Sequence, residues 1–135
     1  MEEVVREKSN LLAVSAIVTD GKGNILLKKR MKEPDAGSWE LFATYPYLDE
    51  PLEEAVQRVL REKGGIKEIE SIEFSSRYYD RPGRHPGKAC IPLIFIAQIA
   101  PGFESPDTAW FSRVDLAEIP VALDNRQTLA DLGFV

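Results

Sequence analysis

The sequence predicts a single α/β domain in which a mixed β-sheet is sandwiched between helices (α/β/α). The chain has 135 residues, the usual length of one domain. Two long β-prone apolar runs, residues 11–19 and 89–100, lie on either side of one amphipathic helical stretch at residues 51–63. Strands that surround a central helix and precede a final helix are typical of a sheet covered on both faces.

The first part of the chain predicts a β-hairpin followed by a loop. Residues 11–19 form a long β-prone run, and residues 25–30 are expected to be the returning strand. The turn between them, residues 20–24, contains two glycines, which adopt positive φ angles without strain. Residues 31–38 are expected to be a loop, and residues 39–43 a short strand.

The central helix has clear signals at both ends. Asp49 or Glu50 opens it, and Pro51 suits its first position, where the missing N–H costs nothing. Gly64 and Gly65 end it. Apolar residues recur at helical spacing and form one stripe: Leu52, Ala55, Val56, Val59 and Leu60.

The second half predicts three more strands and a closing helix, in one domain that spans residues 1–135 and has a flexible start at about residues 1–9. The strands are expected at residues 69–79, 89–100 and 108–112, the loops at 80–88 and 101–107, a turn near 115–119 and the helix at about 124–132.

Composition excludes several classes of protein. The net charge of −5 disfavours long nucleic acid and anionic membranes as partners. A single cysteine, Cys90, cannot form an intramolecular disulfide, and its apolar surroundings predict a core position. Residues 1–8 are too charged for a signal peptide, and no apolar run approaches the roughly 20 residues that span a bilayer. We therefore expect a cytoplasmic protein.

Four charged residues occur at four-residue intervals along the central helix. Glu50, Glu54, Arg58 and Glu62 share one helical face because of this spacing. Such a row forms surface ion pairs, or it presents oxygen ligands to Mg²⁺ while the arginine orients a carboxylate. The spacing alone leaves both interpretations open.

The same stretch resembles the Nudix signature. That signature is Gly, five residues, Glu, seven residues, Arg-Glu, an aliphatic residue, any residue, Glu-Glu, any residue, Gly and an aliphatic residue. All spacings hold here, and six positions match: Glu50, Arg58, Leu60, Glu62, Gly65 and Ile66. Three positions depart from it, because Thr44 replaces Gly, Val59 replaces Glu and Lys63 replaces Glu.

The resemblance extends over roughly residues 10–133 and is closest to family members that act on ADP-ribose or nucleoside diphosphate sugars. It includes the segments Gly37-Ser38-Trp39-Glu40-Leu41, Glu50-Pro51-Leu52-Glu53-Glu54-Ala55, Tyr79-Asp80-Arg81-Pro82-Gly83-Arg84-His85-Pro86-Gly87, Trp110-Phe111 and Leu123-Asp124-Asn125-Arg126-Gln127-Thr128-Leu129. It implies the Nudix fold and cleavage of a diphosphate linkage by water, assisted by Mg²⁺ or Mn²⁺.

The departures fall on the implied metal ligands. In the family, glutamates at the positions of Val59, Glu62 and Lys63 supply most of the metal's oxygen ligands, and here only Glu62 remains. Lysine offers donors and no acceptor, so Lys63 repels a metal and pairs with Glu62, or its ammonium replaces the metal and holds a phosphate. It is equally open that Lys63 is an exposed lysine that the helix dipole favours at the C-terminus of the helix. Phe42-Ala43-Thr44 also replaces the family's Pro-Gly-Gly turn, which restricts the backbone beside the helix.

Three hypotheses follow. In the first, the chain binds a nucleotide-like small molecule and hydrolyses it weakly or not at all, without tightly bound Mg²⁺. In the second, it is an active metal-dependent hydrolase that borrows carboxylates from Glu40, Glu50 or Glu54. In the third, it is a protein-interaction module without catalysis. A homodimer also stays open, since family members often dimerise.

The implied site residues fall into two groups. We expect catalytic roles for Glu62, Glu50 and Arg58, with Glu62 also as the metal ligand if a metal binds. We expect ligand-binding roles for five residues that suit phosphate recognition or base stacking: Arg30, Lys63, Tyr79, Arg81 and Arg84.

Overall fold

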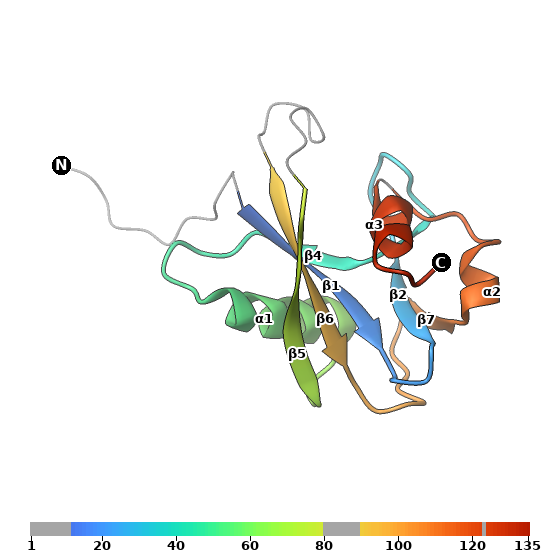
Figure 1. The fold of residues 1–135 in the computed structure, drawn as a ribbon, viewed down its shortest axis with the longest axis horizontal. Helices are drawn as coiled ribbons and strands as arrows, with labels where there is room; N and C mark the ends of the chain where they lie inside the picture. The colour runs from blue at the N-terminus through green and yellow to red at the C-terminus, as the bar shows by residue number, and fades with distance from the viewer. Residues whose placement is uncertain (1–11, 80–89, 123) are drawn as a thin grey trace.

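The computed structural model describes residues 12–79, 90–122 and 124–135. Its elements, in chain order, are β1 (Leu12–Thr19), β2 (Ile25–Lys29), β3 (Trp39–Glu40), β4 (Phe42–Thr44), α1 (Leu52–Gly64), β5 (Ser71–Tyr78), β6 (Ile91–Gln98), β7 (Thr108–Phe111), α2 (Arg113–Leu116) and α3 (Asn125–Asp131) (Figure 1).

The strands form one mixed, seven-stranded sheet in the order β3-β2-β1-β6-β5, with β4 paired to β1 and β7 paired to β2. β1 and β6 run parallel, with Val14 opposite Leu93, and the other pairings are antiparallel. The central strand β1 is buried on both faces, which suits its run of apolar, often β-branched residues.

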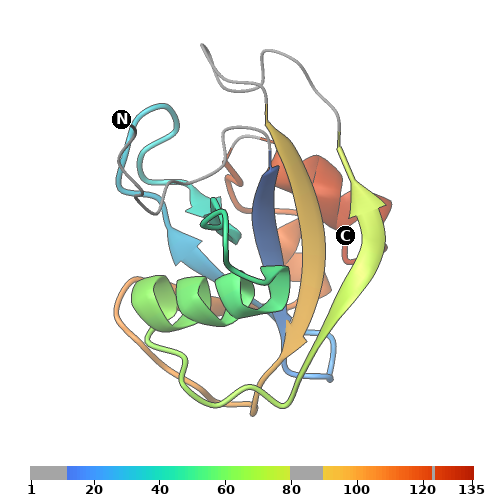
Figure 2. The same cartoon turned by 90° about the vertical axis from the view of Figure 1, so that its left-hand side faces the viewer.

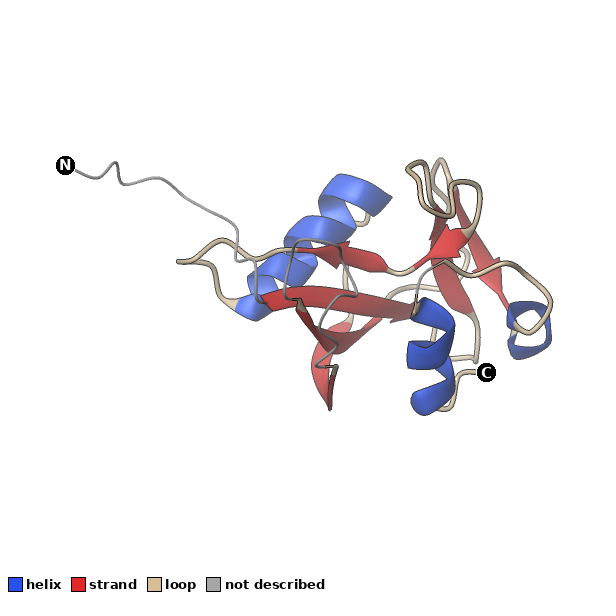
Figure 3. Cartoon of the chain, turned by 90° about the horizontal axis from the view of Figure 1, so that it is seen from above, coloured by secondary structure: helices blue, strands red, loops and turns tan. Residues whose placement is uncertain are grey.

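Helices cover both faces of the sheet. Alternate residues of β1 point to opposite sides: Val14 packs in the core beneath α1, and Ile17 packs in a second core that includes Leu116 of α2 and Leu129 of α3. Figure 2 shows α1 against one face with α3 behind the sheet, and Figure 3 shows these helices on opposite sides of the strands. The predicted α/β/α sandwich is therefore confirmed.

The central helix begins one residue later than predicted. Pro51 precedes the first helical residue, with an extended ψ of 143°, so it is the cap and not the first helical position. The predicted end is confirmed, because Gly65 adopts a left-handed φ of 67° and its N–H donates to the Arg61 carbonyl. In the described part of the chain, no helix is long and apolar enough to cross a membrane.

Two other predicted elements differ from the structure. The strand expected at residues 39–43 is broken into β3 and β4 at Leu41, whose N–H donates to Oδ1 of Asn125 on α3 at 3.0 Å. The turn expected near residues 115–119 overlaps the end of the short helix α2, whose N-cap, Ser112, accepts a hydrogen bond from the Asp115 N–H at 3.2 Å. Cys90 is buried, as predicted.

Candidate functional site

The close packing of α1 on β4 defines the site. Gly64, the last residue of α1, lies against Phe42 of β4, and a Cβ atom added at Gly64 would be 2.8 Å from Cε1 of Phe42. Real Cβ atoms essentially never come that close to another heavy atom, so glycine permits this approach. It brings the end of α1, which carries Glu62 and Lys63, beside the strand that replaces the family's glycine-rich turn.

Arg58 holds the segment that precedes α1. Its Nε and Nη2 atoms donate to the two carboxylate oxygens of Glu50 at 2.8 and 2.9 Å, and Nη2 also donates to the Tyr45 carbonyl at 3.1 Å. The Arg58 and Glu50 side chains are only 10% and 7% exposed. The hydrogen bonds to Glu50 raise the pKa of Arg58, so its guanidinium keeps its charge despite its burial.

The Arg58–Glu50 pair also fixes the approach to the helix. Glu50 accepts a hydrogen bond from the Tyr47 N–H at 3.1 Å, and the Arg58 guanidinium lies over the Tyr47 ring at 4.6 Å from its centroid. A bidentate arginine–carboxylate pair with these additional contacts is rigid. These contacts favour positioning roles for Glu50 and Arg58, and their predicted catalytic roles stay untested.

Glu62 is the only acidic residue left at the three metal-ligand positions of the signature. Its carboxylate is 3.4 Å from Nη1 of Arg58, and its side chain is 57% exposed. Val59 is completely buried in the core beneath α1, as predicted from the apolar stripe. The structure thus places one accessible carboxylate on this part of the helix, next to an arginine.

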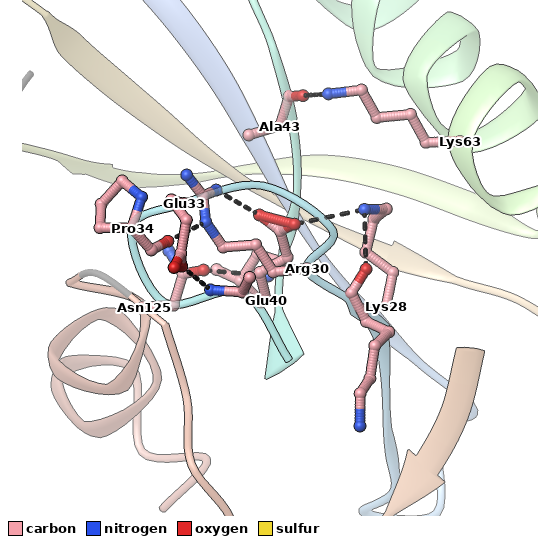
Figure 4. A network of polar contacts seen from close by, with 11 residues as sticks. Lys28, Arg30, Glu33, Pro34, Glu40, Ala43, Lys63 and Asn125 are labelled. Carbon is pink, nitrogen blue, oxygen red and sulfur yellow. Dashed lines mark hydrogen bonds and ion pairs between the residues drawn. The ribbon is translucent and has the colours of Figure 1, made fainter. Parts of the chain in front are cut away.

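Lys63 bonds across the gap between helix and strand. Its Nζ atom donates to the Ala43 carbonyl at 2.7 Å, a contact drawn at the top of Figure 4. This contact spans 20 residues of the chain. Pairing of Lys63 with Glu62, one of the arrangements expected from the sequence, stays a prediction. The ammonium lies where the resemblance implies a metal-ligating carboxylate.

A second group of charged side chains lies on β2, on β3 and just after β2. Glu40 accepts hydrogen bonds from Lys28 at 3.2 Å and from Arg30 at 3.0 Å (Figure 4). Arg30 also donates through Nε to the Pro34 carbonyl at 2.6 Å. The predicted ligand-binding residue Arg30 therefore lies in a group with one more cation than anion. Sequence reasoning missed Lys28, although the two-residue spacing of Lys28 and Arg30 in an extended segment puts both on one face.

Tyr79 is a core residue that links the sheet to the last helix. It is 9% exposed, and its hydroxyl donates to Asp131 of α3 at 2.6 Å. Burial, together with this hydrogen bond, raises the pKa of Tyr79. Its neighbour Tyr78 is exposed. This placement favours a structural role for Tyr79. The predicted ligand-binding residues Arg81 and Arg84 lie outside the described residues.

The residues at the end of α1 do not fit a divalent metal. Mg²⁺ prefers several oxygen ligands, whereas this site offers one carboxylate between an arginine and a lysine. Across residues 12–79, 90–122 and 124–135, no three His, Cys, Asp or Glu side chains converge as metal ligands. The side chains around this carboxylate are therefore cationic, an arginine and a lysine.

The model of the NUDIX domain matches residues 9–132. The chain belongs to the Nudix family. It is 29% identical over 135 aligned residues to the ADP-ribose pyrophosphatase of Methanocaldococcus jannaschii, with 93% of this chain and 77% of that protein covered. The chain is therefore a Nudix protein related to ADP-ribose pyrophosphatases, and Nudix hydrolases generally use divalent metals.

Solved structures share the fold. The NUDIX domain of Shewanella oneidensis NrtR, solved in complex with ADP ribose, matches with a TM-score of 0.74 and 24% identity over 92% of this chain and 86% of that one. A bifunctional NMN adenylyltransferase/ADP ribose pyrophosphatase from Francisella tularensis matches with a TM-score of 0.70 and 20% identity, over 95% of this Nudix chain and 42% of its own. The predicted Nudix fold is confirmed.

Proposed function

We propose that this Nudix protein binds a nucleoside diphosphate compound of the ADP-ribose class beside the end of α1 and hydrolyses it weakly or not at all. The observation that carries the proposal is the replacement of two implied metal ligands by a buried valine and by a lysine bonded to a backbone carbonyl. Without those ligands, the site lacks the metal that would stabilise charge on phosphorus and activate water.

The ligand class is supported by the relatives and by the local charges. The Methanocaldococcus jannaschii relative is an ADP-ribose pyrophosphatase, and the Shewanella oneidensis NUDIX domain was solved with ADP ribose. Lys63 provides an ammonium donor at the end of α1, and Lys28 and Arg30 provide an ammonium on β2 and a guanidinium just after it. Such donors suit the oxygens of a diphosphate.

The active-hydrolase hypothesis requires borrowed carboxylates, and two of the three candidates are already engaged. Glu40 accepts hydrogen bonds from two cations, and Glu50 is held by both of its oxygens on Arg58. Glu54 is exposed on the first turn of α1, far along the helix from Glu62. A metal at Glu62 would therefore have to disrupt existing ion pairs to gain further carboxylate ligands.

The interaction-module hypothesis would need a continuous apolar surface. Five large hydrophobic side chains are exposed among the described residues: Met31, Leu48, Phe74, Tyr78 and Val114. Only Phe74 and Tyr78 share an element, the edge strand β5, and single exposed hydrophobic residues are normal for a globular protein. The described residues therefore favour the ligand-binding hypothesis over the interaction-module hypothesis.

A combined binding and hydrolysis screen tests the proposal. The purified chain is titrated with ADP-ribose by calorimetry and then incubated with ADP-ribose, nucleoside diphosphate sugars, dinucleotides and nucleoside triphosphates, with Mg²⁺, Mn²⁺ or EDTA. We expect ADP-ribose to bind and AMP or phosphate release to stay near background. Fast metal-dependent release would contradict the proposal, and loss of that release in Glu40→Gln, Glu50→Gln or Glu54→Gln would identify the borrowed carboxylate. The cytoplasmic location and the homodimer stay predictions.

A further inference from the structure

Lys63 is a cation placed at a position where the family resemblance implies a metal ligand. Its ammonium is 2.7 Å from the Ala43 carbonyl oxygen, which is a normal length for a charged hydrogen bond. Backbone carbonyl oxygens bind hard metal cations as well as N–H donors. The ammonium therefore makes an oxygen contact that a metal ion at the same place would also seek.

We propose that Lys63 is the built-in cation of this site, so that a diphosphate binds here without any divalent metal. The inference rests on the proposed function and deepens it, since it names the residue that replaces the metal's charge. Lys63 would hold its ligand through charge and N–H donors, and it would exclude Mg²⁺ from the Ala43 carbonyl.

The charges around Lys63 support the binding of an anionic diphosphate. The ammonium of Lys63 donates to the Ala43 carbonyl, which is a neutral group. Three residues earlier in the chain, Glu40 is shared by Lys28 and Arg30, which leaves that group with a net charge of 2 − 1 = +1. Because three extended residues span at most about 11 Å, Glu40 and Ala43, the residues that these two cationic groups contact, lie close together along the chain. Figure 4 shows them in a single view.

The same contacts argue against a metal. A divalent ion at the Ala43 carbonyl would have to displace the ammonium or lie within a few ångströms of it, where the two positive charges repel each other. Glu62 alone does not offset this repulsion, since its carboxylate is already beside Arg58.

Titrations with and without metal test the proposal. ADP-ribose and inorganic pyrophosphate are each titrated by calorimetry into wild type, Lys63→Met, Lys63→Arg and Lys67→Met, in EDTA and in Mg²⁺. Lys67 is the matched control, an exposed lysine in the loop that follows α1. We expect wild-type affinity to agree within about twofold between the two buffers. Loss of one charge-assisted contact should weaken Lys63→Met by roughly 10- to 100-fold in EDTA. Lys63→Arg should retain binding, and Lys67→Met should match wild type.

A second titration, with Mn²⁺ and no nucleotide, tests metal exclusion directly. We expect no micromolar Mn²⁺ affinity in wild type and a measurable gain in Lys63→Glu. Urea midpoints for each variant show that it is folded, which is expected because Lys63 is exposed.

The outcomes separate this inference from the proposed function. If wild type binds ADP-ribose only with Mg²⁺, or if Lys63→Met binds like wild type in EDTA, the role of Lys63 is overturned while ligand binding stands. If pyrophosphate binds through Lys63 but ADP-ribose does not bind at all, the role of Lys63 is supported and the proposed ligand class is wrong. If neither ligand binds wild type in either buffer, both proposals are wrong.

Discussion

Replacing Arg58 with methionine removes a buried ion pair and keeps much of the apolar stem. In the folded chain, the guanidinium donates to both oxygens of Glu50 and to the Tyr45 carbonyl, at 2.8–3.1 Å. The Arg58 and Glu50 side chains are only 10% and 7% exposed, so water would solvate the abandoned carboxylate poorly. Removal of one partner from a buried pair typically costs about 3–5 kcal/mol. We expect Arg58→Met to lose a free energy of unfolding in this range.

Urea unfolding followed by circular dichroism measures this loss. Arg61→Met is the matched control, because Arg61 is an exposed arginine on the same helix and should change stability by no more than about 0.5 kcal/mol. A double-mutant cycle with Glu50→Gln should give a coupling energy above about 1 kcal/mol. A loss below about 1 kcal/mol in Arg58→Met, or one equal to the loss in Arg61→Met, would refute the view that this pair fixes the approach to α1.

Two further variants test the implied metal ligands and the last helix. Val59→Glu combined with Lys63→Glu restores the three carboxylates; the buried position of Val59 makes this cost about 1–3 kcal/mol, which a domain stable by about 5–15 kcal/mol survives. We expect this double variant to gain Mg²⁺ affinity and to release some AMP from ADP-ribose above the level of EDTA controls. Fast turnover by wild type that the double variant slows would contradict the hypothesis that the site is degenerate. Burial and the bond to Asp131 raise the pKa of Tyr79, so its contribution to stability is complete below the ordinary tyrosine pKa near 10 and is lost as pH rises through the raised value. Tyr79→Phe should lack this alkaline loss in urea midpoints measured from about pH 8 to 11, and equal losses in both proteins would show that another group titrates.

The helix α1 could be predicted from sequence because its signals are local. The apolar stripe buries Val59, and the glycine pair ends the helix with Gly65 in the left-handed conformation. The break between β3 and β4 was not predictable, since it depends on a hydrogen bond from Leu41 to Asn125, 84 residues away. Local patterns carry no information about such a partner.

In the site, too, local sequence signals were predictable and long-range contacts were not. The spacing of the signature predicted that Glu50 and Arg58 share a helical face, but Glu50 precedes α1 and bonds to Arg58 from the loop before the helix. The departure at Lys63 was visible in the sequence, but its partner was not. The Ala43 carbonyl is a backbone atom, and every residue has one, so only the packing of α1 on β4 selects it. Residue identity thus revealed which charge had changed, and tertiary structure determined what that charge touches.

The contact between Gly64 and Phe42 has a consequence for mutational scans of this protein. An alanine at position 64 would act as a wedge, because its Cβ would meet the Phe42 ring at 2.8 Å and force α1 away from β4. The Lys63 ammonium would then retreat from the strand although its own chemistry is unchanged. A scan for loss of ligand affinity would therefore identify Gly64, which has no side chain and touches no ligand. Its effect is to set the distance between α1 and β4.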